Sequence, residues 1–134
     1  MIAVTGAAGF IGSNLVHRLA VDGAELLLVD DALTPAKAPN LAGLERFAFL
    51  RHDHFLVDLA DGRVRPTAIY HLGACSSTTE TDWDYLSRNN VEYTKSLWIW
   101  CTEHRVPFIY ASSAATYGDG SRGFDDRTPP TELV

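Results

Sequence analysis

The sequence predicts an α/β fold in which helices cover both faces of a parallel sheet. An apolar run at residues 2–4 is followed by three regularly spaced glycines and then by an amphipathic stretch at residues 10–20. Strand-like and helix-like segments continue to alternate along the chain, which implies parallel pairing with right-handed crossovers. We therefore expect a Rossmann-like, doubly wound parallel sheet.

The glycine turn comes first. Gly6, Gly9 and Gly12 form G-x-x-G-x-x-G between a strand and a helix, which is the context that a dinucleotide fingerprint requires. We expect Gly6 to permit the tight turn, Gly9 to let the backbone approach a diphosphate, and Gly12 to let the helix pack against the strand. The free N–H groups and the positive dipole end of the helix would then bind that diphosphate.

The later elements are predicted from apolar runs bounded by turn residues. In chain order they are a strand at 24–30, a weaker strand at 46–50, a short helical or irregular piece within 52–65, a buried strand at 67–72, a long helix at 83–104 and a buried strand at 106–111. The apolar positions of the long helix, Leu86, Tyr93, Leu97 and Cys101, follow the helical period. The polar residues 118–134 carry several glycines and a proline pair, so we expect a loop there.

Length and composition set the class of protein. The 134 residues fit one domain, so we expect residues 1–134 to be a single dinucleotide-binding domain. The net charge of −6 argues against non-specific nucleic-acid binding. No apolar run approaches the ~20 residues of a membrane span, and no basic leader precedes the first strand. We expect a cytoplasmic protein in which Cys75 and Cys101 are free thiols.

Polar residues follow several of the predicted strands and meet at one edge of the sheet. Asp30 stands eighteen positions after Gly12, as expected for the acid that binds the adenosine ribose. Asp31 doubles the negative charge, which by itself favours NAD over NADP. Lys37 would offset this preference if the connector folds back. Ser113 would place a hydroxyl at the substrate oxygen that is oxidised or reduced.

Two further histidine-containing segments have simpler interpretations. His52, Asp53 and His54 cluster in the sequence, but no fourth ligand has suitable spacing, so we expect no metal site. His71 lies in a buried strand, and we expect it to be hydrogen-bonded in the core rather than catalytic.

The glycine pattern resembles that of the short-chain dehydrogenase/reductase superfamily, and its ending through Phe10 and Ile11 resembles the extended, sugar-nucleotide-modifying branch. Three later segments are more discriminating: residues 71–80 (HLGACSSTTE), the pair Asn89 and Asn90, and residues 110–118 (YASSAATYG). Together they resemble the family of ADP-L-glycero-D-manno-heptose 6-epimerases. The match runs from residue 1 to about residue 118.

This resemblance implies NADP(H)-dependent epimerisation at C6 of an ADP-linked manno-heptose for lipopolysaccharide cores, by transient oxidation and re-reduction. It implies NADP with NAD as the alternative, a nucleotide-sugar substrate, no nucleic-acid or membrane partner, and a homo-pentamer. At the nucleotide end it implies backbone contacts to the diphosphate from Phe10 and Ile11, and ribose contacts from Asp30 and Asp31. It places Lys37 near the 2′-phosphate and His52 on the adenine side. The loop of Leu72, Gly73, Ala74, Cys75 and Ser76 would line the cofactor, Asn89 would contact it, and Ser113 would supply the catalytic hydroxyl.

The chain departs from the family pattern at three points. The family usually has Glu at the position of Leu72 and Asn at that of Asp31, so nucleotide preference stays open. None of the five tyrosines is followed by lysine four residues later, although the family needs such a pair. The resemblance therefore implies an incomplete, inactive N-terminal piece. Its sheet is truncated after about the fifth strand, and it lacks the sugar-binding domain. Another extended sugar-nucleotide epimerase or dehydratase and a non-catalytic nucleotide-binding module are the alternatives.

Overall fold

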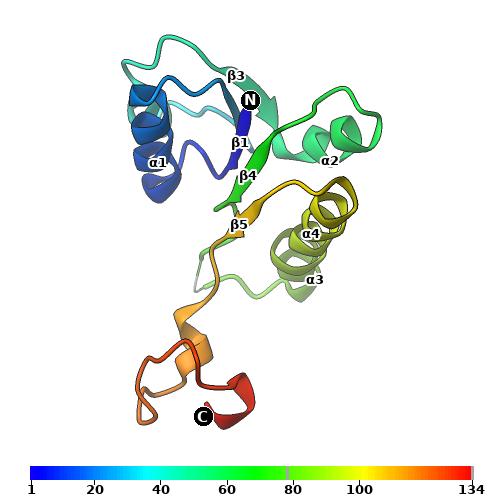
Figure 1. Ribbon diagram of the computed structural model, residues 1–134. Coiled ribbons are helices and arrows are strands. Elements are labelled where there is room, and N and C mark those ends of the chain that lie inside the picture. Colours follow the sequence, from blue (N-terminus) through cyan, green and yellow to red (C-terminus); the bar gives the residue numbers. More distant parts are fainter. Residues whose placement is uncertain (78, 134) are drawn as a thin grey trace.

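The computed structural model describes residues 1–77 and 79–133. They contain a parallel sheet of five strands in the order β3-β2-β1-β4-β5, which confirms the predicted doubly wound fold. The strands are β1 Ile2–Thr5, β2 Leu26–Asp30, β3 Ala48–Arg51, β4 Ala68–His71 and β5 Phe108–Tyr110 (Figure 1). The strand order reverses at β1, which has β2 on one side and β4 on the other.

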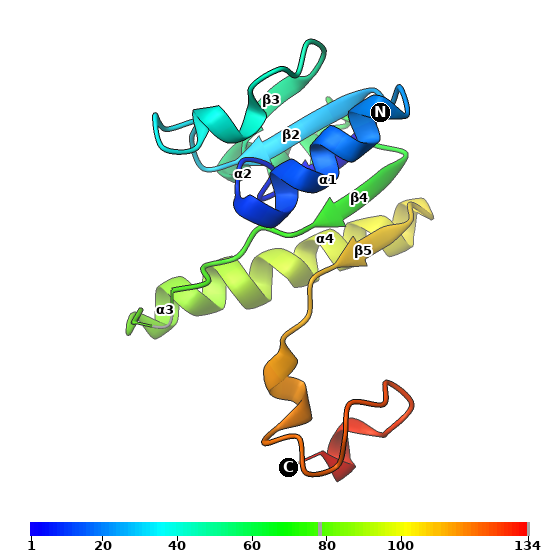
Figure 2. The same ribbon diagram turned by 90° about the vertical axis from the view of Figure 1, so that its left-hand side faces the viewer.

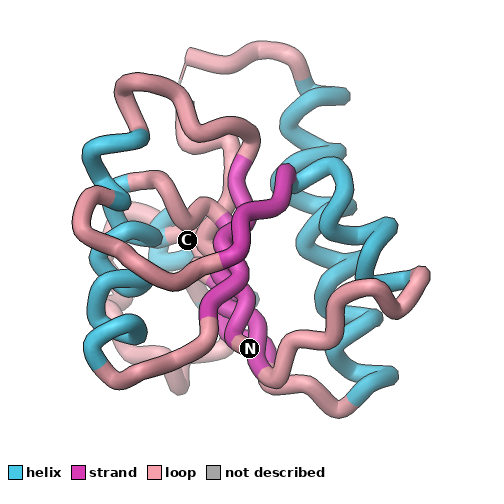
Figure 3. The backbone as a smooth tube through the Cα atoms, turned by 90° about the horizontal axis from the view of Figure 1, so that it is seen from above, coloured by secondary structure: helices cyan, strands magenta, loops and turns pink. Residues whose placement is uncertain are grey.

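Helices lie on both faces of this sheet (Figure 3). They are α1 Phe10–Val21, α2 His52–Ala60, α3 Trp83–Leu86 and α4 Tyr93–His104. The predicted helix at 83–104 is present, but a π-helical stretch, Ser87–Glu92, separates α3 from α4. There the N–H of Tyr93 binds the carbonyl of Arg88, five residues back. A π-helical turn inside an α-helix is frequent at functional sites.

The core has two layers because successive side chains of a strand point to opposite faces. Val4 of β1 joins Val16 of α1 in one cluster. Ala3 of the same strand joins Phe55 of α2 and Leu97 of α4 in the other. The strands that lead to the site are therefore packed on both faces. Within residues 1–77 and 79–133, no helix has both the length and the apolar content that crossing a bilayer requires.

The last strand differs from the prediction of a buried strand at 106–111. Ile109 and Tyr110 of β5 are 46% and 45% exposed. Among the described residues β5 pairs with β4 alone, so its outer edge has no neighbour and its side chains are only partly covered. Beyond β5 the chain leaves the sheet (Figure 2) and, as predicted, is mostly loop, with short 3₁₀ turns at Ala114–Tyr117 and Pro130–Glu132.

Candidate functional site

The ends of β1 and β4 approach each other backbone to backbone. Gly6 follows β1 with φ +65°, and a Cβ placed on it would lie 2.7 Å from the nitrogen of Gly73. A Cβ on Gly73 would in turn lie 3.0 Å from the nitrogen of Gly6. The positive φ confirms the tight turn that the sequence predicts at Gly6. The backbones of Gly6 and Gly73, with Oγ1 of Thr5 beside them, therefore form the floor between these strand ends.

Helix α1 begins directly after this turn. A Cβ on Gly12 would lie 2.1 Å from the carbonyl oxygen of Gly6, so the helix packs on the turn as the glycine spacing predicts. Gly9 is the N-cap, no side chain caps the helix, and no acidic residue lies in its first turn. The first N–H groups of a helix have no carbonyl of a preceding turn to bind. With the positive end of the helix dipole, they form a site for an anion.

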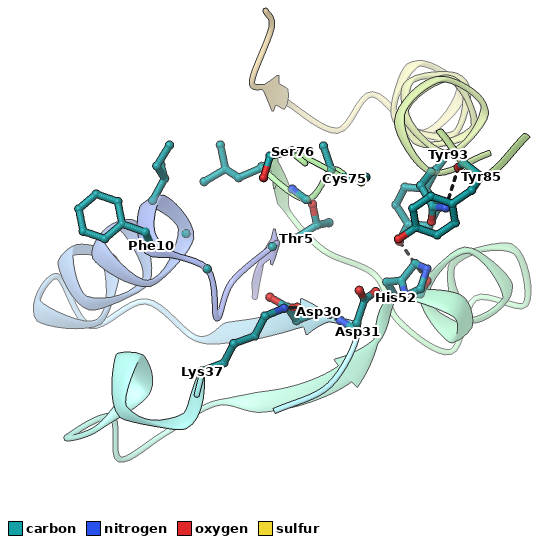
Figure 4. A pocket seen from close by; sticks show the side chains of 18 residues that line it. Thr5, Phe10, Asp30, Asp31, Lys37, His52, Cys75, Ser76, Tyr85 and Tyr93 are labelled. Atoms are coloured by element: carbon teal, nitrogen blue, oxygen red, sulfur yellow. Dashed lines mark hydrogen bonds and ion pairs between the residues drawn. The ribbon is translucent and has the colours of Figure 1, made fainter. Parts of the chain in front are cut away.

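Phe10 and Ile11 open the helix, with side chains that are 83% and 68% exposed. In Figure 4 the ring of Phe10 lies on the far side of the helix from Asp30. What this turn offers to a ligand is therefore its backbone, as the sequence analysis expects for both residues.

Asp30 is the last residue of β2 and is only 6% exposed. Its Oδ2 accepts a hydrogen bond from the N–H of Ala8 at 2.9 Å. Its Oδ1 accepts from the N–H of Asp31 at 2.9 Å and from Nζ of Lys37 at 2.5 Å. The carboxylate therefore ties the glycine turn to the end of β2, a role that the sequence analysis did not assign to it.

The connector after β2 folds back over the glycine turn. The amide of Asn40 donates to the carbonyl of Ala8 at 2.9 Å, and the ring of His17 lies 2.9 Å from the carbonyl of Asn40. This return is what places Lys37 against Asp30, which fulfils the condition set by the sequence analysis (Figure 4). The Lys37 side chain is 36% exposed, so part of its charge is available at the rim.

Next to Asp30 and Lys37 lies a second group of contacting side chains, formed by Asp31, His52 and Tyr93. Nδ1 of His52 lies 2.7 Å from a carboxylate oxygen of Asp31, although the two are misaligned for a hydrogen bond. Tyr93 donates its hydroxyl to the carbonyl of His52 at 3.1 Å. Burial, and then the negative charges of Asp31 and Asp53, raise the pKa of Tyr93 above its usual value. The phenol therefore stays protonated and serves as a fixed donor.

The loop after β4 is attached to the π-helical stretch. The N–H of Cys75 donates to Oδ1 of Asn90 at 2.8 Å, and Nδ2 of Asn90 donates to the carbonyl of Cys75 at 2.9 Å. The neighbouring Asn89 donates to the carbonyl of Tyr85 at 2.8 Å. Thr78, in the motif at residues 71–80, lies outside the described residues.

His71 confirms the prediction of a hydrogen-bonded core histidine. The residue is 4% exposed, and its Nδ1 and Nε2 lie 2.6 Å and 2.8 Å from the hydroxyls of Thr5 and Thr94. Burial lowers the pKa of His71 to about 4, so its ring is neutral near pH 7.

These segments surround a cavity of about 510 Å³ at the carboxyl ends of β1, β2 and β4 (Figure 4). Every residue expected to bind the cofactor lines it: Gly6, Gly9, Phe10, Ile11, Gly12, Asp30, Asp31, Lys37, His52, Leu72, Gly73, Ala74, Cys75, Ser76 and Asn89. Thr5, Tyr85 and Tyr93 line it as well, and the sequence analysis missed them. Tyr93 was assigned to the apolar stripe of the long helix, Thr5 directly precedes the glycine motif, and Tyr85 belongs to no motif.

Ser113 is not among the residues that line this cavity. It lies on the exposed segment after β5, where its Oγ accepts a hydrogen bond from the N–H of Ala115 at 3.2 Å and caps a 3₁₀ turn. The ladder of β5 with β4 ends at Tyr110, and the chain then turns away from the sheet (Figure 2). Among the described residues, no group of three His, Cys, Asp or Glu side chains has the arrangement of a metal site.

Comparisons with known proteins point to one family. A family model described as the NAD dependent epimerase/dehydratase family matches residues 2–133. The ADP-L-glycero-D-manno-heptose-6-epimerase of Alkalilimnicola ehrlichii is 49% identical over 124 residues, which cover 90% of this chain and 39% of that protein.

Solved structures agree with this match. The ADP-L-glycero-D-manno-heptose-6-epimerase of Helicobacter pylori has a TM-score of 0.75 at 25% identity, covering 88% of this chain and 40% of that one. The Bordetella bronchiseptica enzyme WbmG, in complex with NAD and UDP, has a TM-score of 0.72 at 26% identity, covering 87% of this chain and 38% of that one. The chain therefore spans about two fifths of the length of these relatives.

Proposed function

We propose that this chain, which belongs to the NAD-dependent epimerase/dehydratase family, supplies the cofactor site of an epimerase. That enzyme would act at C6 of ADP-linked manno-heptose, for lipopolysaccharide core biosynthesis. The observation that carries the proposal is the cavity in which the glycine turn, the start of α1 and Asp30 meet. The 49% identity to a relative named for that reaction supports the choice of substrate.

The residues present fit a dinucleotide. Side chains at Gly6 and Gly12 would collide with backbone atoms, so only glycine at these positions permits the tight turn and the close packing of α1 on it. A diphosphate would then bind the N–H groups at the start of α1. Asp30 lies at the end of the neighbouring strand, where the adenosine ribose would be held. The loop at residues 72–76 would line the opposite wall. When bound, a nicotinamide cofactor supplies reversible hydride transfer, and the protein supplies its orientation.

We propose NADP as the preferred cofactor, with NAD as the alternative. The Lys37 ammonium at the rim would attract a 2′-phosphate, and its position against Asp30 supports this role. The carboxylate of Asp31, 67% exposed, opposes it. The two charges act on the same end of the cavity, so their balance decides the preference.

The proposal concerns the whole protein, because the relatives are much longer than this chain. No tyrosine of these 134 residues is followed by lysine four positions later. Ser113 would act as the catalytic hydroxyl only if the segment after β5 turned toward the cavity. The homo-pentamer and the cytoplasmic location stay predictions.

The test uses the protein at its natural length. We expect denaturation of the purified protein to release a nucleotide with the mass of NADP or NAD. We expect inversion at C6 of the ADP-linked heptose, followed by nuclear magnetic resonance, and no conversion of UDP-glucose. Conversion of UDP-glucose but not of the heptose would favour another sugar-nucleotide epimerase, a class that shares this fold. Nucleotide binding without conversion of any sugar nucleotide would favour a non-catalytic module.

A further inference from the structure

The wall of the cavity at residues 72–76 belongs to no strand or helix, so side chains elsewhere must hold it. Leu72 still donates to the carbonyl of Thr5 at 3.2 Å, and Gly73 donates to Oγ1 of Thr5 at 3.0 Å. Beyond Gly73 the loop is held by hydrogen bonds to the π-helical stretch instead of to β1. Both backbone polar groups of Cys75 are bound by the Asn90 amide, at 2.8 Å and 2.9 Å.

Asn90 is itself fixed by a chain of hydrogen bonds whose direction the geometry determines. The hydroxyl of Thr94 donates to the carbonyl of Asn90 at 2.9 Å, because a carbonyl oxygen only accepts. Since that hydroxyl has one hydrogen, Nε2 of His71, at 2.8 Å, must donate to it. In the neutral ring Nδ1 then accepts from the Thr5 hydroxyl at 2.6 Å, and the oxygen of Thr5 accepts from Gly73.

One arrangement of hydrogens therefore satisfies the polar side-chain atoms of this network. It runs through the side chains of Thr5, His71 and Thr94 and reaches the backbone of Asn90. A buried network that is fully satisfied in this way is stiff, and losing one member leaves its partners unpaired.

We propose that Asn90 is a positioning residue for the bound nucleotide. Asn90 does not line the cavity, whereas its neighbour Asn89 does. Its effect passes through Cys75, whose backbone it fixes so that the loop at residues 72–76 keeps one shape against the cofactor. This inference rests on the proposed function, because it assigns a task to a residue behind the proposed cofactor site.

The decisive variant is Asn90→Ala, in the protein at its natural length. It leaves the N–H and the carbonyl of Cys75 unpaired, so the loop should sample other shapes. We expect the affinity for NADP and NAD, measured by titration calorimetry, to fall roughly tenfold or more, as for loss of paired hydrogen bonds.

The two cysteines supply a second readout. The thiol of Cys75 lies in the loop and is partly exposed, whereas Cys101 is 2% exposed and burial raises its pKa to about 11. We expect Asn90→Ala to speed alkylation of Cys75 by iodoacetamide several-fold, read by peptide mass spectrometry, and to leave Cys101 protected. General loosening of the fold would expose both thiols.

Two positions on α4 provide matched controls. Ser96 and Thr102 donate to the carbonyls of Glu92 and Trp98, each at 2.8 Å, in the same way that Thr94 donates to Asn90. Ser96→Ala and Thr102→Ala should change neither nucleotide affinity nor Cys75 labelling. Thr94→Val should weaken nucleotide binding in the same direction as Asn90→Ala.

The outcomes separate the two proposals. If the natural protein binds neither NADP nor NAD, the proposed function fails, while Cys75 labelling still tests whether Asn90 holds the backbone of Cys75. If it binds and Asn90→Ala binds equally well, the positioning role is overturned. If Asn90→Ala also exposes Cys101, Asn90→Asp decides, since it keeps the acceptor for the Cys75 N–H. An affinity for Asn90→Asp above that of Asn90→Ala supports the role, and an affinity no higher than that of Asn90→Ala overturns it.

Discussion

Gly6 and Gly73 meet through their backbones at the point where the strand order of the sheet reverses. A Cβ on Gly6 would lie 2.7 Å from the nitrogen of Gly73, and that same N–H donates to Oγ1 of Thr5 at 3.0 Å. The close approach leaves no space for a side chain under the cavity. It also couples the glycine turn to the loop at residues 72–76, so the two walls of the proposed nucleotide site share one contact.

Gly6→Ala should therefore damage both stability and nucleotide binding. The new methyl group meets backbone at φ +65°, so neither wall can yield cheaply. Strain and overpacking together predict a loss of about 2–4 kcal/mol in the free energy of unfolding. Urea unfolding would measure it. The control is Gly43→Ala, where φ is +83° but nothing lies within 4 Å of the new Cβ. An equal loss at both positions would show that the contact with Gly73 contributes nothing.

How much of this was predictable depends on how local each feature is. The turn at Gly6 and the packing at Gly12 were predicted because close approach and positive φ select for glycine at particular positions. The places of Gly6, Asp30 and Gly73 followed from the rule that parallel strands place their carboxyl ends at one edge. Most of the other cavity-lining residues were expected only because the chain resembles the epimerase family. The return of the connector through Asn40 was left open, because it depends on contacts between distant segments.

Three features could not be predicted from the sequence. The exposure of Ile109 in β5 was missed because an apolar run looks the same whether or not a neighbour covers it. The π-helical stretch was missed because the paired contacts of Asn90 with Cys75 span fifteen residues of chain. Tyr93 was taken as a core residue because it fits the helical period, yet it both packs against the core and lines the cavity.

His71 should make the protein less stable in mild acid. Burial lowers its pKa from 6.5 to about 4, so between these values the unfolded chain binds more protons than the folded one. Stability is therefore full above pH 6.5 and should fall by on the order of 3 kcal/mol as the pH approaches 4. Urea midpoints at pH 7 and pH 4.5 test this. His71→Gln should flatten the pH dependence, whereas His54→Gln, at an exposed site, should retain it. An unchanged pH dependence in His71→Gln would contradict the assignment.

Lys37 should set the preference between the two nucleotides. Lys37→Gln removes the ammonium from the rim but leaves Asp30 with its bonds from Ala8 and Asp31. We expect NADP affinity to fall about tenfold, the scale of one lost charge-assisted hydrogen bond, and NAD affinity to change little. Titration calorimetry with both nucleotides measures the ratio. Lys95→Gln is the matched control, because Lys95 pairs with Glu92 on the exposed face of the long helix. Equal losses for NADP and NAD would show that Lys37 acts only by supporting Asp30.

The exposed edge at β5 should make the isolated 134-residue chain associate. Among the described residues β5 pairs with β4 alone, and Ile109, Tyr110 and the nearby Trp98 are 46%, 45% and 54% exposed. Unpaired strand edges beside apolar side chains are sites of edge-to-edge pairing, and a lysine at such an edge opposes it. Sedimentation velocity should show oligomers or aggregates of the wild-type chain and fewer for Ile109→Lys. Val21→Lys, at an 80% exposed position on α1, should leave association unchanged. A monomeric wild-type chain with a sharp, reversible unfolding transition would refute the prediction, because it would mean that this edge is stable without a partner.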